Sequence, residues 1–261
     1  MSMSESPKAD GPVAGHLGGR CAVVTGGGRG LGRGITEALV AAGADVVVLA
    51  RQPVPADLVE AAARHGRSIE GRQVDLHDAA ALESVATELL VEREVDILVN
   101  NAGMQHRAPA AEFPLQAWDD VLAVNLRAVF QLCQLLGAPM LQRGRGSVVN
   151  IASLLTFQGG ITVPAYAASK GAVGQLTKAL CNEWAGRGVN VNAVAPGYMA
   201  TDMNEALLAD LDRLRAITER IPAGRWGTPE DIGGVVAFLC SPAAQYIHGQ
   251  VIAVDGGWLA R

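Results

Sequence analysis

The chain has 261 residues, of which 49% are hydrophobic and 18% are charged, and its formal net charge is −5. This length and composition suit one large α/β domain with a full core. Because no basic stripe offsets the acidic balance, the sequence argues against a nucleic-acid-binding surface. No run approaches the roughly 18 apolar residues of a membrane span. We therefore expect neither nucleic acid nor membrane as a partner.

The N-terminal stretch and the cysteines indicate where such a protein works. Residues 1–15 are polar and rich in Ser, Gly and Pro, so we expect a disordered leader before a single domain over residues 16–261. The cysteines lie far apart and mostly in apolar runs, at Cys21, Cys133, Cys181 and Cys240. We expect reduced core thiols instead of disulfides or metal ligands. The histidines show no ligand spacing either, so the sequence predicts a cytoplasmic protein without a metal site.

A glycine-rich turn lies between the first predicted strand, residues 20–24, and the first predicted helix. The turn carries Gly26, Gly30 and Gly32. Glycines let a backbone approach a pyrophosphate closely, and a helix N-terminus supplies N–H donors and a positive dipole. The spacing is not the usual G-x-G-x-x-G, and a glycine cluster alone fits a plain turn equally well. Its place between strand and helix nevertheless predicts a dinucleotide-binding turn.

The end of the second predicted strand, residues 45–50, bears on the choice of cofactor. A carboxylate there would bind the adenosine ribose 2′-hydroxyl of NAD, but this strand ends with Ala50 and Arg51. Arg29 in the glycine turn could reach the same place. A guanidinium matches a phosphate with two parallel hydrogen bonds, which favours NADP(H). If Arg51 is only a solvated loop residue, NAD(H) binds through the glycine turn alone.

The rest of the chain alternates apolar runs of strand length with amphipathic stretches. Further strands are expected at residues 71–76, 95–99, 147–151, 189–195 and 251–255. Further helices are expected at residues 54–63, 79–94, 115–136, 165–185 and 229–239. This alternation indicates a parallel sheet that is covered on both faces and binds ligands at the carboxyl ends of its strands. Residues 199–219 are predicted to form a mobile helical flap over the site.

Tyr166 and Lys170 are the strongest candidates for chemistry, because their i,i+4 spacing puts both on one helix face. A tyrosine has an ordinary pKa of about 10, and a nearby ammonium lowers it. The pair could therefore exchange a proton with a carbonyl or alcohol, and Ser153 at a strand end could bind the same oxygen. The spacing alone often arises by chance. Asn125, amid apolar neighbours in a predicted helix, fits a structural amide as well as a catalytic one.

Together these motifs resemble the short-chain dehydrogenase/reductase family from about residue 16 onward. The resemblance rests on motifs in one order, namely Thr25-Gly26-x-x-x-Gly30-x-Gly32, Asn100-Asn101-Ala102-Gly103, Asn125, Ser153, Tyr166-x-x-x-Lys170 and Pro196-Gly197. It implies one Rossmann-type doubly wound α/β domain, with a seven-stranded parallel sheet and helices on both faces, usually in a tetramer. It also implies a catalytic set of Asn125, Ser153, Tyr166 and Lys170.

The same resemblance implies a cofactor site, in which Asp75 matches the position near the adenine ring. The residues expected in that site are Gly26, Arg29, Gly30, Leu31, Gly32, Arg51, Asp75, Leu76, Asn101, Ala102, Gly103, Tyr166, Lys170, Pro196, Gly197, Met199 and Thr201.

A narrower resemblance is to the sugar-acid dehydrogenases of that family, which act on open-chain sugar acids. These are the 2-deoxy-D-gluconate 3-dehydrogenases, also known as 2-dehydro-3-deoxy-D-gluconate 5-dehydrogenases, and the related gluconate 5-dehydrogenases. It rests on residues 153–160, 182–185, 195–201, 220–227 and 255–261. Such enzymes generally favour NAD(H), so the end of the second strand departs from their preference. Alternatives are a 3-oxoacyl-carrier-protein reductase or other carbonyl reductase, and a non-catalytic dinucleotide-binding sensor.

A sugar-acid substrate needs a cation for its carboxylate. Arg107 is the candidate, with His106 and Gln158 as helpers beside Ser153 and Tyr166, although a solvated surface arginine fits the sequence equally well. The acidic charge weighs against a carrier-protein partner, and the intact catalytic set weighs against a sensor. Trp258 near the C-terminus would be exposed unless it packs within its own subunit. An exposed Trp258 would mark a subunit contact and favour a homotetramer.

Overall fold

The computed structural model describes residues 16–261, so the leader predicted for residues 1–15 lies outside this part of the chain. The strands are β1 (Cys21–Thr25), β2 (Asp45–Ala50), β3 (Ile69–Gln73), β4 (Ile97–Asn100), β5 (Gly146–Ile151), β6 (Val189–Pro196) and β7 (Val251–Val254). They form a 7-stranded sheet in the order β3-β2-β1-β4-β5-β6-β7. Every neighbouring pair is parallel, which confirms the predicted doubly wound α/β fold.

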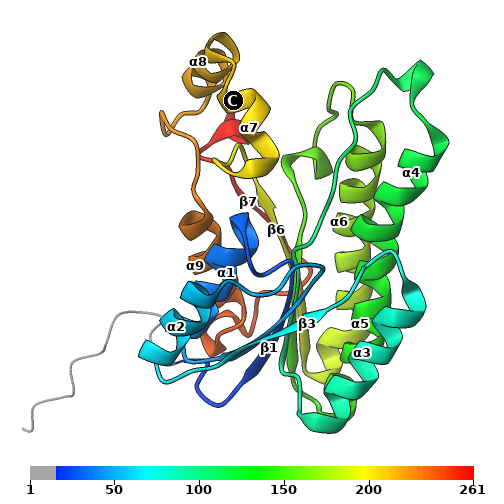
Figure 1. Cartoon of the computed structure of the whole chain (residues 1–261), viewed down its shortest axis with the longest axis vertical. Coiled ribbons are helices and arrows are strands. Elements are labelled where there is room, and N and C mark those ends of the chain that lie inside the picture. Colours follow the sequence, from blue (N-terminus) through cyan, green and yellow to red (C-terminus); the bar gives the residue numbers. More distant parts are fainter. Residues whose placement is uncertain (1–15) are drawn as a thin grey trace, which may run out of the picture.

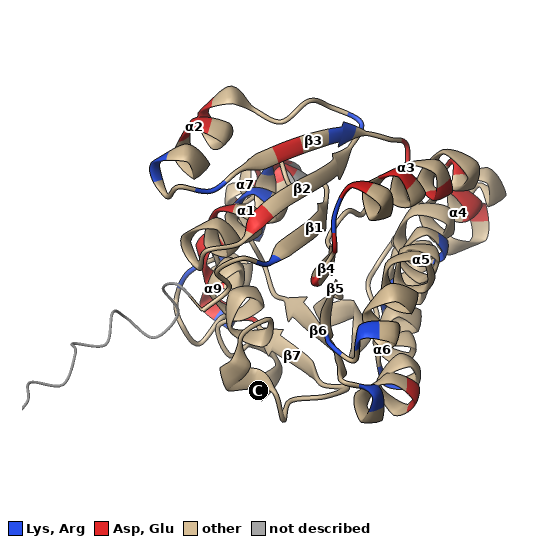
Figure 2. Ribbon diagram, turned by 90° about the horizontal axis from the view of Figure 1, so that it is seen from below, with Lys and Arg blue, Asp and Glu red and all other residues tan. Residues whose placement is uncertain are grey.

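Helices cover both faces of this sheet (Figure 1, Figure 2). One face carries α1 (Gly30–Ala41), α2 (Ala56–Arg64) and α9 (Pro229–Leu239). The other face carries α3 (Ala79–Glu92), α4 (Leu115–Leu122), α5 (Ala128–Arg143) and α6 (Pro164–Trp184). Short helical turns are η1 (Ala110–Glu112), η3 (Leu154–Thr156), η4 (Ala185–Arg187), η5 (Asp202–Asn204), η6 (Pro242–Ala244) and η7 (Trp258–Ala260).

The central strands are buried on both faces because successive side chains point to opposite sides of a sheet. In β1, Val23 packs into the core beneath α3 and α5, whereas Val24 packs into the core beneath α1 and α9. The unbroken apolar runs in the sequence are what a strand covered on both faces requires. The strand order reverses between β1 and β4, and a ligand crevice is expected at their carboxyl ends.

Element ends differ from the prediction at the β3 edge of the sheet. The third strand covers Ile69–Gln73 instead of residues 71–76, and Val74 and Leu76 beyond its end still pack into the core beneath α3. The helix expected from Val54 begins later, at Ala56 after Pro55.

The long helix predicted for residues 115–136 is longer and is interrupted. α4 passes through a π-helical turn, η2 (Ala123–Arg127), into α5, which ends before Gly144 with φ 68°. By length and composition Leu115–Arg143 could cross a membrane, so the expectation that no run approaches a membrane span is wrong. Its most apolar window is 50% buried inside the protein, and one such helix is weak evidence for a membrane span.

The stretch predicted as a helical flap forms two helices, α7 (Glu205–Leu208) and α8 (Leu211–Arg220). In Figure 1 they stand above the carboxyl ends of β6 and β7, beside the C-terminus. Leu207, Leu214 and Ile217 pack with two tryptophans, Trp226 and Trp258, in an apolar cluster separate from the two sheet cores. The helical character is confirmed, and the mobility of the segment stays a prediction.

Candidate active site

The glycine turn and the start of α1 form a concave backbone surface. Any side chain larger than that of glycine would fill this cradle. Gly26 and Gly30 have φ of 66° and 49°, values that favour glycine. A Cβ at Gly32 would lie only 2.0 Å from the carbonyl oxygen of Gly26. The first turn of α1 has no acidic residue and no side-chain cap, so its N–H groups can bind an anion. Leu31, in the same turn, packs against the core beneath. The cradle therefore fits the pyrophosphate of a dinucleotide.

The loop after β4 is tied to this turn. Thr25 Oγ1 accepts hydrogen bonds from the backbone N–H groups of Asn101 at 3.0 Å and Ala102 at 2.9 Å. A Cβ built at Gly103 would lie 3.7 Å from Lys170 Nζ and 3.4 Å from Asn125 Oδ1. Residues 101–103 thus lie between the glycine turn and the predicted catalytic side chains.

The segment after β6 forms the opposite wall. Pro196 ends β6, and the N–H of Gly197 donates to the Val254 carbonyl at 2.9 Å. Met199 is buried, and a Cβ at Gly30 would lie 3.9 Å from Thr201 Cβ. The structure therefore brings the predicted residues after β6 up to the glycine turn.

Two exposed arginines, Arg29 and Arg51, follow β1 and β2, where the adenosine ribose is expected. Within residues 16–261 neither guanidinium makes an ion pair or hydrogen bond. The pKa of Asp75 is lowered, chiefly by a hydrogen bond from the backbone N–H of His77, and the charge of Arg51 adds a smaller lowering. Leu76 is buried beside it. Both guanidinium groups are thus available for a phosphate.

Ser153, Tyr166 and Lys170 meet beyond the end of β5. Ser153 forms the N-cap of η3, and its Oγ accepts a hydrogen bond from the Leu155 N–H at 3.2 Å. Lys170 is buried and its Nζ donates to the Ile151 carbonyl at 2.6 Å. The same Nζ lies 5.7 Å from the centroid of the Tyr166 ring. The helical spacing and the strand end therefore bring this trio together.

The electrostatics of the trio differ from the sequence-based expectation. Burial raises the pKa of Tyr166, and a hydrogen bond with Ser153 offsets part of that rise. Burial also lowers the pKa of Lys170 to about 8. The net shift of the Tyr166 pKa is therefore upward instead of downward, because burial disfavours the charged form of each side chain.

Asn125 is fully buried in the π-helical turn η2. Its side-chain amide makes two hydrogen bonds to the backbone of one residue, Met104. Its Oδ1 accepts from the Met104 N–H at 2.9 Å, and its Nδ2 donates to the Met104 carbonyl at 2.9 Å. Nδ2 also lies 3.1 Å from Ser169 Oγ, one residue before Lys170. The side chain thus anchors the loop after β4 to the helix that carries Tyr166.

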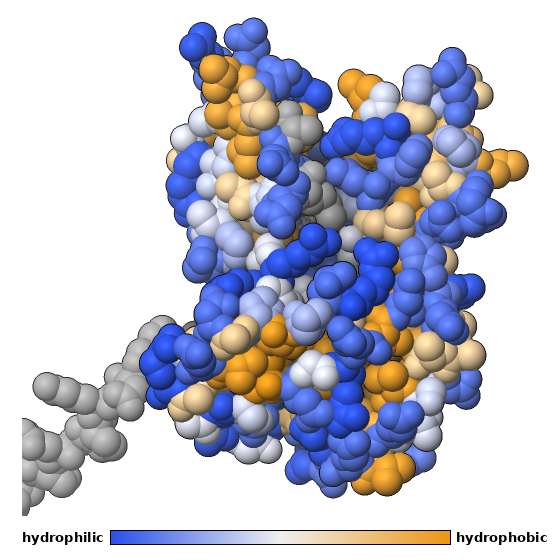
Figure 3. All heavy atoms as spheres, viewed as in Figure 1, coloured by the Kyte–Doolittle hydropathy of each residue, from blue (hydrophilic) through white to orange (hydrophobic). Residues whose placement is uncertain are grey.

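The predicted substrate residues lie on two loops, one after β4 and one between η3 and α6. Arg107 and His106 are exposed, and the His106 ring meets the edge of Phe113 at a centroid distance of 5.3 Å. The N–H of the next residue, Ala108, donates to the Thr162 carbonyl at 3.0 Å, which joins the loop after β4 to the loop before α6. Figure 3 shows the surface hollowed between the α7–α8 side and the α4 side of the molecule.

Trp258 is buried within its own subunit, with 4% of its surface exposed, so the alternative of packing within the subunit holds and this side chain does not mark a subunit contact. Its indole Nε1 lies 3.4 Å from Oε1 of Gln158, and its ring packs against the tilted ring of Tyr198 at 4.7 Å between centroids. Sequence reasoning missed this contact because the two residues are 100 positions apart and share no motif.

Comparisons with known proteins agree with this geometry. A family model described as enoyl-(acyl carrier protein) reductase matches residues 26–259. The 2-dehydro-3-deoxy-D-gluconate 5-dehydrogenase of Bacillus subtilis is 49% identical over 245 residues, which are 94% of this chain and 96% of that protein.

Two solved structures share the fold and were crystallised with NADP. One, described as an NAD(P)-dependent gluconate 5-dehydrogenase from Beutenbergia cavernae, is 53% identical with a TM-score of 0.92, covering 96% of this chain and 100% of that one. Another, a gluconate 5-dehydrogenase from Burkholderia cenocepacia in complex with NADP and tartrate, is 37% identical with a TM-score of 0.90, covering 95% and 98%. With a matching family model over most of its length and relatives this similar, the chain belongs to the short-chain dehydrogenase/reductase family.

Proposed function

We propose that this protein is an NADP(H)-dependent oxidoreductase that interconverts a secondary alcohol and a ketone on a sugar acid. The observation that carries the proposal is the meeting of Ser153, Tyr166 and buried Lys170 beside the glycine cradle. Relatives named for gluconate and 2-dehydro-3-deoxygluconate dehydrogenases support the substrate class. The free thiols fit a reducing compartment, and we place the enzyme in the cytoplasm.

We propose a role for each member of the set. Ser153 and Tyr166 hold the substrate oxygen, and the Tyr166 hydroxyl passes the proton. Lys170, whose Nζ donates to the Ile151 carbonyl, carries a positive charge beside the ring and binds the nicotinamide ribose in this proposal. Asn125 bonds to the loop after β4 through Met104 and, in the same proposal, holds a water that continues the proton relay. The bound nicotinamide supplies or accepts the hydride.

A substrate panel tests this function directly. Purified protein is mixed with NADP(H) or NAD(H) and with gluconate, 2-dehydro-3-deoxygluconate, a neutral polyol or acetoacetyl thioesters, and the absorbance of the reduced cofactor is followed. Faster turnover of the sugar acids supports the proposal. Faster turnover of the thioesters would favour a carrier-protein reductase, and cofactor binding without any turnover would favour a sensor.

Arg107→Ala is expected to raise the KM for sugar acids about fivefold, because an exposed charge-assisted hydrogen bond to the carboxylate is lost. The KM for neutral polyols of similar size should stay within twofold. Steady-state kinetics on both substrate classes checks this. Arg187→Ala, at an exposed arginine in η4, serves as the control. Equal effects of Arg107→Ala on both classes would rule out a carboxylate clamp.

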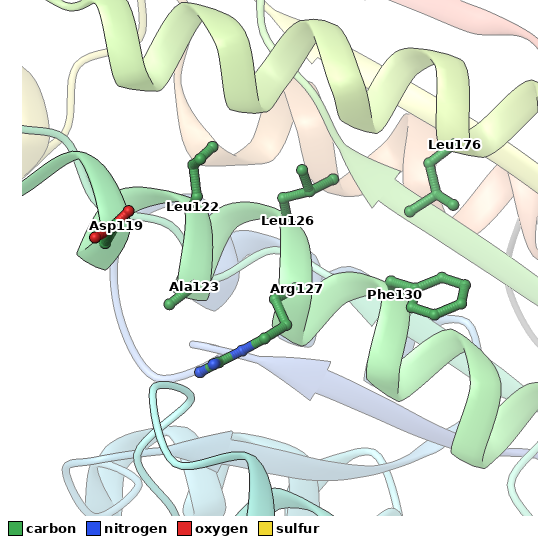
Figure 4. Close-up of a pocket in the computed structure, with 7 residues that line it drawn as sticks. All are labelled: Asp119, Leu122, Ala123, Leu126, Arg127, Phe130 and Leu176. Atoms are coloured by element: carbon green, nitrogen blue, oxygen red, sulfur yellow. The ribbon is translucent and has the colours of Figure 1, made fainter. Parts of the chain in front are cut away.

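We further propose that the subunits assemble into a homotetramer. An apolar hollow on the outer face of the α4–α6 layer supports this, since exposed apolar patches usually mark contacts. Figure 4 shows how the α4–α5 stretch and α6 direct their side chains toward it. Its apolar lining is Leu122, Ala123, Leu126, Phe130 and Leu176, and the charged residues Asp119 and Arg127 line it as well.

Light scattering is expected to return about four times the chain mass of 27.1 kDa. Phe130→Asp, at a side chain that is 46% exposed in one subunit, should shift the mass downward because it puts a charge in the apolar contact. A wild-type mass of one chain would contradict the tetramer, while leaving the catalytic assignment untouched.

A further inference from the structure

We propose that Trp258 is a positioning residue for substrate recognition, whose indole N–H orients the amide of Gln158 so that the amide NH2 faces the substrate. The inference rests on the proposed function, because it takes Gln158 as a contact of the sugar acid. It assigns the C-terminal turn of the chain a part in specificity, although that turn carries none of the catalytic side chains.

The direction of the Gln158 amide follows from hydrogen-bond chemistry. Nε1 of Trp258 lies 3.4 Å from Oε1 of Gln158. An indole nitrogen can only donate, so only the carbonyl oxygen of the amide can face it favourably. Within residues 16–261 the Nε2 of Gln158 has no hydrogen-bond partner. Two N–H donors are thus left for an oxygen-rich ligand.

The place of Gln158 makes those donors useful. Its backbone N–H donates to the Leu154 carbonyl at 3.1 Å, so the residue is held one turn after Ser153. Its side chain is half-buried and comes from the same loop that leads to Tyr166. An NH2 group at this position suits a hydroxyl or carboxylate oxygen of a sugar acid.

Two side chains contact the indole ring, and hydrogen bonds hold the turn that carries it. The guanidinium carbon of Arg220, at the end of α8, lies 3.8 Å from the ring centroid, and the Tyr198 ring packs at 4.7 Å. Asp255 accepts hydrogen bonds from the N–H groups of Gly257 at 2.8 Å and Leu259 at 2.9 Å. An aromatic ring held in this way is a fixed reference for a neighbouring amide.

Arg261 joins the turn that carries Trp258 to the end of α8. Its Nη2 donates to the Glu219 carbonyl at 2.7 Å, and its Nε donates to the Arg220 carbonyl at 3.1 Å. The turn that carries the indole is therefore bonded to the end of α8. Substrate recognition by Gln158 is in this way tied to the position of the helical segment that stands over the site.

Loss of the indole N–H has a defined consequence for an anionic ligand. Without that donor, the Gln158 amide can turn over and present its carbonyl oxygen to the substrate. The amide oxygen of Gln158 and a carboxylate oxygen of the substrate would then face each other, and both can only accept a hydrogen bond. The penalty falls on substrates that offer an acceptor at that place, and a carboxylate is penalised most.

The test is Trp258→Phe, which keeps an aromatic ring for Arg220 and Tyr198 but removes the N–H. The KM for the best sugar acid should rise about fivefold, while kcat and the Kd for NADPH stay within twofold. Trp118→Phe, at a half-buried tryptophan in α4, is the matched control. In a Gln158→Met background, Trp258→Phe should add less than 1.5-fold to KM, because the amide it orients is gone.

Several results would overturn the proposal. A drop in kcat and thermal stability without a change in KM would mean that Trp258 only supports the fold. A full fivefold effect in the Gln158→Met background would mean that Trp258 acts by another route. If wild-type protein turns over no sugar acid, the proposed function fails instead. A crystal structure of Trp258→Phe then decides the inference, because an unmoved Gln158 amide contradicts it and a turned or displaced one supports it.

Discussion

Replacing Tyr166 with phenylalanine is expected to lower kcat by about 10²-fold or more, the size of effect that a general acid–base contributes. The ring that packs near Lys170 remains, but the hydroxyl that shares a hydrogen bond with Ser153 is gone. The Kd for NADPH should stay near the wild-type value, because the glycine cradle is unchanged. Turnover is measured by absorbance of the reduced cofactor, and binding by fluorescence titration.

Tyr246→Phe is the matched control for that change. Tyr246 is 99% exposed, so loss of its hydroxyl should leave both turnover and binding as they are. If Tyr166→Phe keeps more than a tenth of the wild-type kcat, Tyr166 is not the proton donor.

Arg51→Ala is expected to weaken NADP(H) binding about tenfold or more and to leave NAD(H) almost unchanged. A hydrogen bond to a charged group contributes about 1.5–3 kcal/mol, and the 2′-phosphate that Arg51 would bind is present only in NADP(H). No ion pair within residues 16–261 competes for this guanidinium. Titration of each cofactor against wild-type and variant protein gives the four Kd values needed.

Arg64→Ala, at an exposed arginine at the end of α2, controls for the loss of one positive charge from the surface. It should change neither Kd by more than twofold. Two results would contradict the interpretation that Arg51 binds the 2′-phosphate. One is a wild-type protein that binds NAD(H) more tightly than NADP(H), and the other is an equal loss of affinity for both cofactors in Arg51→Ala.

The elements that sequence reasoning located well are those whose signal is local. β1 and β2 stand out because they are apolar runs covered on both faces, whereas the apolar residues of β5 and β6 are interrupted by buried asparagines such as Asn150 and Asn192. The β3 edge strand reads Ile-Glu-Gly-Arg-Gln and has no apolar run. The apolar residues Val74 and Leu76 that follow it are therefore included in the predicted strand, which extends too far.

At the candidate site the same distinction holds. The glycine cradle and the Tyr166–Lys170 pair follow from spacing within one element, and the structure brings them together. The direction of the Tyr166 pKa shift depends on how deeply the packed fold buries the ring, and spacing carries no information about that. The contact between Trp258 and Gln158 likewise exists only after the C-terminal turn has packed against α8.

The π-helical turn η2 holds one residue more than an α-helical turn, because its hydrogen bonds join residues five apart instead of four. In an α-helix each residue turns the chain by about 100°, as 3.6 residues per turn require. If residues 123–127 were regular α-helix, α4 would therefore be rotated against α5 by about that angle. The wider turn takes up this rotation, so that Val121 in α4 is buried while Asn125 bonds to Met104. One long helix can in this way bury apolar side chains on both sides of the turn and still direct an amide at the loop after β4.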